Sequence, residues 1–176
     1  MEKKAITSLS LAVILFSWIA TVTASTEFVV YISNDNGFSI RFPSSWEKRE
    51  GVGGSVVAAL SPQTNPADQF RPNANVIVKD LHRNATLEEY MHAVITYMNK
   101  QSGFQIHDKG QIKINSSDAG WILYSQRRES INFKVLTYIL VQKRRAYQIT
   151  CTATVDQFAR YKKKFEDIAQ TFKFEY

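Results

Sequence analysis

Hydrophobic and polar side chains alternate along much of this chain, which predicts β-strands. The segment 38–42 is the clearest case. Phe38, Ile40 and Phe42 fall on one face of the predicted strand. Ser39 and Arg41 fall on the other face. This alternation predicts a strand with one buried apolar face and one polar face.

Turn residues bound this strand on both sides. Asn36-Gly37 precedes it, and because both residues tolerate a positive φ, the pair predicts a hairpin to an earlier strand over 26–33. Pro43 follows it and lacks the N–H that a ladder needs, so we expect the strand to end there. Trp46 lies just beyond the turn, and we expect it to join the core.

Similar runs predict more strands further along the chain. They cover 55–60, 74–81, 104–115, 119–127, 133–142 and 146–153. A break is expected at Asp108-Lys109-Gly110, and a hairpin tip at Lys143-Arg144-Arg145. The polar segment 61–72 is long for a loop in a compact domain, and such loops are often functional or mobile.

Two segments have the apolar spacing of amphipathic helices. Thr86 and Glu89 form the pattern of a capping box, so the first helix should begin there and end by Gly103. The second should begin near 154–157, with Thr154 or Asp156 as its cap. Several antiparallel strands with two amphipathic helices predict an α+β fold in which an antiparallel β-sheet is sandwiched by α-helices.

The N-terminus has the pattern of a secretory signal peptide. Lys3 and Lys4 precede a largely apolar run over 9–22, which closes on the small residues of Val22-Thr23-Ala24. The run is short for a membrane span, which needs about 20 residues. We therefore expect a cleaved signal peptide over 1–24, a single domain over 25–176 without an integral membrane segment, and a periplasmic or secreted location.

Charge and cysteine content narrow the choice of partners. The chain carries a net charge of +6, which favours acidic proteins or anionic headgroups, while export makes nucleic acid a poor candidate. Its one cysteine, Cys151, lies in a predicted strand and cannot form an internal disulfide. We expect a buried structural thiol and a monomeric domain.

No catalytic pattern is present in the sequence. His82, His92 and His107 lack the spacing of a helical metal motif, and the chain has neither a nucleophile elbow nor a phosphate-binding loop. Acidic residues are scattered. We expect no enzymatic activity, no cofactor and no dedicated metal site. The alternative is a periplasmic small-ligand or metal-binding protein that uses the 61–72 loop and a histidine.

Two basic clusters are candidate docking residues: Arg127-Arg128 and Lys143-Arg144-Arg145. If the strands between them form a hairpin, the clusters lie at opposite ends of it and form separate patches. The alternative is that they are solvated turns, since turns tolerate charge.

Several short motifs, in this order and spacing, resemble the PsbP/Mog1/DcrB-like superfamily. They are Phe42–Trp46, Thr86–Tyr90, Gly120-Trp121, the hairpin Tyr138–Cys151 and the closing Ala169–Phe174. The resemblance covers nearly all of the chain after the signal peptide. It implies a central antiparallel sheet between helices and no general enzymatic activity.

Members of this superfamily include lumenal proteins associated with photosystem II, bacterial periplasmic proteins or lipoproteins, and adaptors or chaperones. This chain lacks the lipoprotein cysteine and the long N-terminal extension of photosynthetic members, which argues against a photosystem role. The resemblance transfers no site residue. Together with the export signal, it predicts a non-enzymatic binding or assembly module that docks on a protein partner in the envelope or at a membrane surface.

Overall fold

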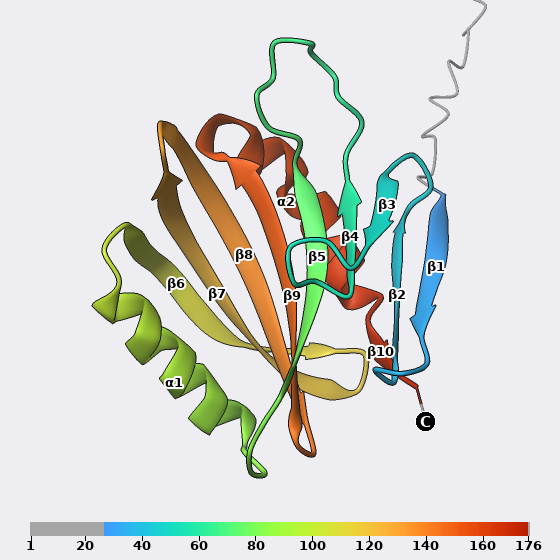
Figure 1. Cartoon of the computed structure of the whole chain (residues 1–176), viewed down its shortest axis with the longest axis vertical. Helices are drawn as coiled ribbons and strands as arrows, with labels where there is room; N and C mark the ends of the chain where they lie inside the picture. The colour runs from blue at the N-terminus through green and yellow to red at the C-terminus, as the bar shows by residue number, and fades with distance from the viewer. Residues whose placement is uncertain (1–26, 176) are drawn as a thin grey trace, which may run out of the picture.

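Two antiparallel sheets and two helices form the part of the protein that the computed structural model describes, residues 27–175 (Figure 1). The strands are β1 (Phe28–Ser33), β2 (Phe38–Pro43), β3 (Glu47–Glu50), β4 (Val57–Leu60), β5 (Asn73–Asp80), β6 (Phe104–Ile114), β7 (Ser117–Arg128), β8 (Ile131–Gln142), β9 (Arg145–Thr154) and β10 (Lys173–Phe174). The helices are α1 (Leu87–Lys100) and α2 (Val155–Gln170). The predicted α+β class is confirmed. The predicted signal peptide over 1–24 lies outside the described residues.

The smaller sheet joins the two ends of the described chain. β2 lies at its centre, with β1 on one side and β10 on the other. β10 pairs Lys173 with Ser39 and Phe174 with Phe38. The last residues of the chain therefore complete a sheet that its first strands begin.

The larger sheet has seven strands in the order β3-β4-β5-β9-β8-β7-β6. Its strands from β6 to β9 form consecutive antiparallel hairpins, and β9 returns to pair with β5. This return brings the turn between β8 and β9 beside the end of β5, which places Arg145 opposite Asp80.

The helices cover opposite faces of the larger sheet (Figure 1). α2 packs against β8 and β9 and also against β2, so it connects the two sheets. α1 packs on β6, β7 and β8. Its predicted capping box is confirmed, because the Thr86 hydroxyl accepts from the Glu89 N–H at 3.1 Å and the Glu89 carboxylate accepts from the Thr86 N–H at 2.8 Å.

The main core lies between the two sheets and α2. Phe38, Ile40 and Phe42 are buried in it, as their alternation predicted, and Trp46 joins them. Ser39, on the predicted polar face, is buried as well, so only Arg41 of that face is exposed. Phe38 stacks on Phe172, with 5.5 Å between the ring centroids. A second, smaller apolar cluster lies beneath α1.

The predicted strand break at Asp108-Lys109-Gly110 is wrong. β6 continues through these residues, with only a register shift between Ile106 and Asp108. Gly110 stays in the strand because the Trp121 side chain crosses it: a Cβ there would lie 2.9 Å from Trp121 Nε1. The glycine provides space for an aromatic ring and does not interrupt the strand.

Two predicted turns differ in detail. Arg145 is the first residue of β9 and pairs with Gln142, so the tip of that hairpin is Lys143-Arg144 alone. In the β1–β2 hairpin only Gly37 takes a positive φ, of 64°, because the loop spans 34–37 and is not a two-residue turn centred on Asn36-Gly37.

The predicted caps of α2 are only partly right. Thr154 is the N-cap residue, but its hydroxyl bonds the Gln157 side chain at 3.0 Å and makes no capping bond to the backbone. Sequence patterns also missed β3 and β10. β3 is fully exposed and charged, and β10 has two residues, so neither carries a hydrophobic signal.

Candidate functional site

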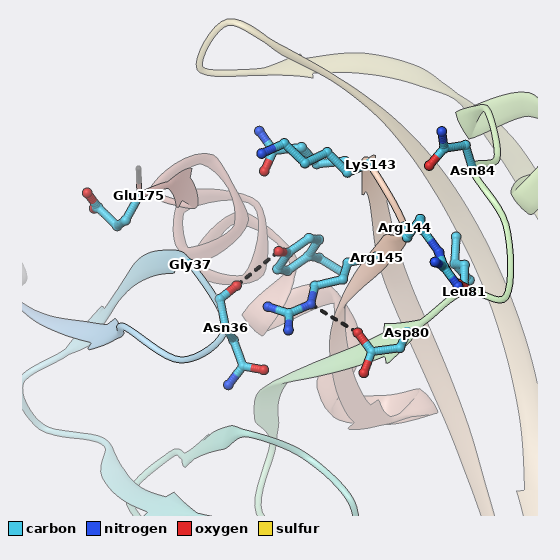
Figure 2. Close-up of a pocket in the computed structure, with 11 residues that line it drawn as sticks. Asn36, Gly37, Asp80, Leu81, Asn84, Lys143, Arg144, Arg145 and Glu175 are labelled. Carbon is cyan, nitrogen blue, oxygen red and sulfur yellow. Dashed lines mark hydrogen bonds and ion pairs between the residues drawn. The ribbon is translucent and has the colours of Figure 1, made fainter.

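A cavity of about 720 Å³ opens at one end of the larger sheet (Figure 2). The β8–β9 turn, the end of β5 and the β1–β2 turn meet there. Its lining residues are Asn36, Gly37, Asp80, Leu81, Asn84, Gln142, Lys143, Arg144, Arg145, Tyr147 and Glu175. Three of these side chains are cationic and two are acidic, so the cavity has a basic excess. We call this region the basic end.

Arg144 fixes the β8–β9 turn to the segment that precedes α1. Its Nε donates to the carbonyl of Leu81 at 3.2 Å, and its Nη2 donates to the carbonyl of His82 at 2.8 Å. The Leu81 N–H donates in return to the Arg144 carbonyl at 2.7 Å. Arg144 therefore has a structural role in addition to its charge.

Arg145 and Tyr147 attach the same hairpin to its other neighbours. Arg145 Nε donates to the Asp80 carboxylate at 3.0 Å, and Nη1 donates to the Asp35 carbonyl at 3.1 Å. The bond to Asp80 raises the pKa of Arg145 above its ordinary value. The Tyr147 hydroxyl donates to the Asn36 carbonyl at 2.9 Å. Figure 2 shows the Arg145 side chain pointing toward Asp80, with a dashed line for their contact.

Lys143 is placed differently from the two arginines. It is exposed, and within the described chain its ammonium makes no hydrogen bond or ion pair. Its backbone takes a left-handed conformation, with φ of 56°, at the tip of the turn. Among residues 27–175, the basic end therefore presents one unpaired ammonium, on a turn that two arginines hold in place.

Arg127 and Arg128 lie at the opposite end of the β7–β8 hairpin, so the predicted separation of the two clusters is correct. Arg127 Nε donates to the Glu129 carbonyl at 3.1 Å. In the amide orientation that satisfies both groups, Arg128 Nη2 donates at 2.7 Å to the side-chain oxygen of Gln126. The structure does not bring these two residues together with Lys143, Arg144 and Arg145.

The three histidines are exposed and lie on separate elements. His107 Nε2 lies 3.0 Å from the hydroxyl of Ser125. Among residues 27–175, no three His, Cys, Asp or Glu side chains are grouped closely enough to share a metal ion. Cys151 is fully buried, and burial raises the pKa of its thiol, so it is held in its protonated form.

Sequence reasoning missed Asp80, Tyr147 and Asn36 as parts of the basic end. Asp80 is the last residue of β5, and its role depends on the pairing of β5 with β9, which are far apart in the sequence. A cross-strand search for opposite charges could have found Asp80 and Arg145 once that register was known.

None of the described helices is both long enough and apolar enough to cross a membrane. No curated protein sequence matches the chain.

Three solved structures share the fold at low sequence identity. LpqN of Mycobacterium tuberculosis, described as involved in cell envelope biogenesis, has a TM-score of 0.68 at 14% identity, over 85% of this chain and 91% of its own. The cyanobacterial PsbP protein CyanoP of Synechocystis has a TM-score of 0.63 at 13% identity, over 87% of this chain and 95% of its own. A putative regulator of unknown function, PA94 of Pseudomonas aeruginosa, has a TM-score of 0.59 at 16% identity, over 82% and 94%.

A family model supports the same assignment from the sequence. The model described as PsbP-like protein matches residues 19–174, which is most of the chain. The three structures share the fold. Because the family model covers most of the sequence, this chain belongs to the PsbP-like protein family.

Proposed function

We propose that this protein is a non-enzymatic, exported binding or assembly module that docks through its basic end on an acidic surface of an envelope protein. The observation that carries the proposal is the anchored turn. Arg144 and Arg145 fix it through four hydrogen bonds to neighbouring segments, and it holds the unpaired Lys143 in solvent. A turn that is already held in place loses little backbone freedom on binding.

The family and the location of relatives support this proposal. One solved structure of the same fold is described as involved in cell envelope biogenesis. The N-terminal pattern of charge, apolar run and small residues is typical of a signal peptide. A basic surface in the envelope attracts acidic partners over roughly the 10 Å range that moderate salt permits.

The chain's single buried cysteine allows a direct test of this docking surface. An Asn84→Cys variant keeps Lys143 and carries one accessible thiol beside it, because Asn84 is exposed and lines the basic end while Cys151 is fully buried. The purified variant is labelled with a thiol-linked photocrosslinker and irradiated with native envelope membranes at low salt. We expect a discrete adduct with one protein, and we expect the adduct to decrease at high salt.

A Lys109→Cys variant is the matched control, because Lys109 is an exposed lysine of β6, away from the basic end. The proposal requires the adduct at position 84 and its absence at position 109. Equal labelling at both positions, or no protein adduct at either, would overturn it.

A further inference from the structure

One face of the larger sheet is only partly covered by a helix. α1 packs mainly on β6, β7 and β8, while β9, β5 and β4 continue beyond it (Figure 1). Of the side chains that α1 itself carries, Met91 and Met98 are the buried ones. Methionine is flexible and fills irregular gaps, so the face of α1 that meets the sheet is apolar and adaptable.

Two cavities on this face form one groove. The first lies beneath α1, with a volume of about 400 Å³, and the second lies over β4, β5 and β9, with about 460 Å³. Tyr124, Gln148 and Thr150 line both, so the two cavities adjoin at these side chains. Each volume falls in the range of roughly 300–1,000 Å³ that is typical of small-ligand sites.

The groove changes from apolar to polar along its length. Beneath α1 its walls include Val94, Phe104, Ile122 and Ile139. At the junction the Gln148 amide donates to the Tyr90 hydroxyl at 2.9 Å. This end offers space bounded by hydrocarbon, which favours an alkyl chain.

The floor of the second cavity is a ladder of uncharged hydrogen-bonding groups. Asn73 pairs with Thr152, and Asn75 pairs with Thr150, across β5 and β9. The side-chain oxygen of Asn75 is buried and has no hydrogen-bond partner. These side chains give the groove a polar, uncharged section.

The charged residues that line the groove are all cationic. They are Lys79, Arg49 and Arg128, and no Asp or Glu is among the lining residues of either cavity. Arg49 is paired with Glu47 at 2.8 Å on the strand edge outside the groove. This charge complement favours an acidic group on the ligand.

We propose that this groove binds a single-chain amphiphile with an acidic headgroup. The alkyl chain lies beneath α1, the polar linker crosses the Asn75 and Thr150 floor, and the acidic group faces Arg49 and Arg128. This site is separate from the basic end, and its ligand is independent of the protein that docks there.

Calorimetric titration with myristoyl lysophosphatidylglycerol, below its micelle concentration, tests the proposal on the chain without its signal peptide. We expect saturable binding that is at least about tenfold tighter than binding of myristoyl lysophosphatidylcholine, which has the same chain and no net charge. No saturable binding, or equal affinity for the two lipids, would contradict the proposal.

Two variants locate the ligand within the groove. Ala93→Trp places an indole into the space beneath α1, and we expect it to weaken binding at least about tenfold. His92→Trp is the control, because His92 is exposed on the same helix and does not line the groove. The double variant Arg49→Gln, Arg128→Gln should bind both lipids with similar affinity.

If Ala93→Trp and the parent protein bind the lipid with equal affinity, the lipid lies elsewhere and the proposal is wrong. These variants leave positions 84 and 143 unchanged, so the photocrosslinking result at the basic end should be the same in each. Failure of lipid binding is therefore distinguishable from failure of docking.

Discussion

Cys151 shows how burial decides the chemistry of a single residue. Its sulfur is fully buried and lies 4.0 Å from the Phe165 carbonyl oxygen. Burial removes the water that would solvate a thiolate, which raises the pKa of the thiol. An unperturbed cysteine ionises near pH 8.5, so the native and unfolded states differ in proton binding above about that pH.

This difference predicts how stability depends on pH. The native state keeps the Cys151 proton, so its contribution to stability is complete below about pH 8.5 and decreases as the pH rises above that value. Urea denaturation between about pH 7 and 9.5 should show a falling free energy of unfolding, with a smaller slope in Cys151→Ala. Iodoacetamide should modify native protein only at the rate of unfolding, and rapid alkylation of native Cys151 would refute this prediction.

Single residues were also the level at which the sequence was most informative. The alternation of Phe38, Ile40 and Phe42 predicted their burial, because each pleat of a strand directs one side chain to the core. Gly110 was interpreted wrongly, because the reason for a glycine there is the Trp121 ring on the neighbouring strand. Local patterns report the chain's own periodicity, and they cannot report which residue lies across a sheet.

At the scale of elements, the position of α1 depends on one close approach to β7. A Cβ on Gly120 would lie 2.6 Å from the sulfur of Met91. The missing side chain therefore lets Met91 pack directly on the sheet. This contact sets how closely α1 can lie over the groove.

Gly120→Ala should overpack this contact and destabilise the protein by about 1–3 kcal/mol. Met91→Ala alone should leave a cavity and cost about 2–5 kcal/mol. Because each change relieves the effect of the other, the double variant should cost less than the sum when measured by urea denaturation. Simple additivity would contradict the contact, and His92→Ala combined with Gly120→Ala should be additive, since His92 is exposed.

Elements with a strong local signal were predicted well, and elements defined by their partners were not. The α1 capping box needs only Thr86 and Glu89, which are three residues apart. β3 has no apolar residue, and it forms because its backbone pairs with β4. The basic end was predicted in part: Lys143, Arg144 and Arg145 were identified, but Asp80 and Tyr147 required the β5–β9–β8 register.

At the scale of the whole molecule, the two sheets depend on the C-terminal segment. Phe174 packs against Tyr147 and Phe172, with ring centroids 5.1 and 5.3 Å away. The Glu175 N–H donates to the Gly37 carbonyl at 3.0 Å. The smaller sheet is therefore held to the core by the segment that follows α2.

Phe174→Ala should lower the free energy of unfolding by about 1–3 kcal/mol, because the ring is half-buried and the truncation leaves the cluster incomplete. Glu175→Ala is the control, since its exposed side chain contributes little and its backbone bond remains. We expect that variant to stay within about 0.5 kcal/mol of the parent in urea denaturation. Equal stability of all three proteins would show that β10 does not hold the smaller sheet.

The pairing of β10 with β2 also determines when folding can finish. Phe38 stacks on Phe172, and β2 pairs with β10, although every strand of the larger sheet lies between them in the sequence. Contacts so distant in sequence form slowly, because the long intervening loop must first be closed. The β2–β10 pairing closes the main core, so we expect these contacts to be among the last that folding makes.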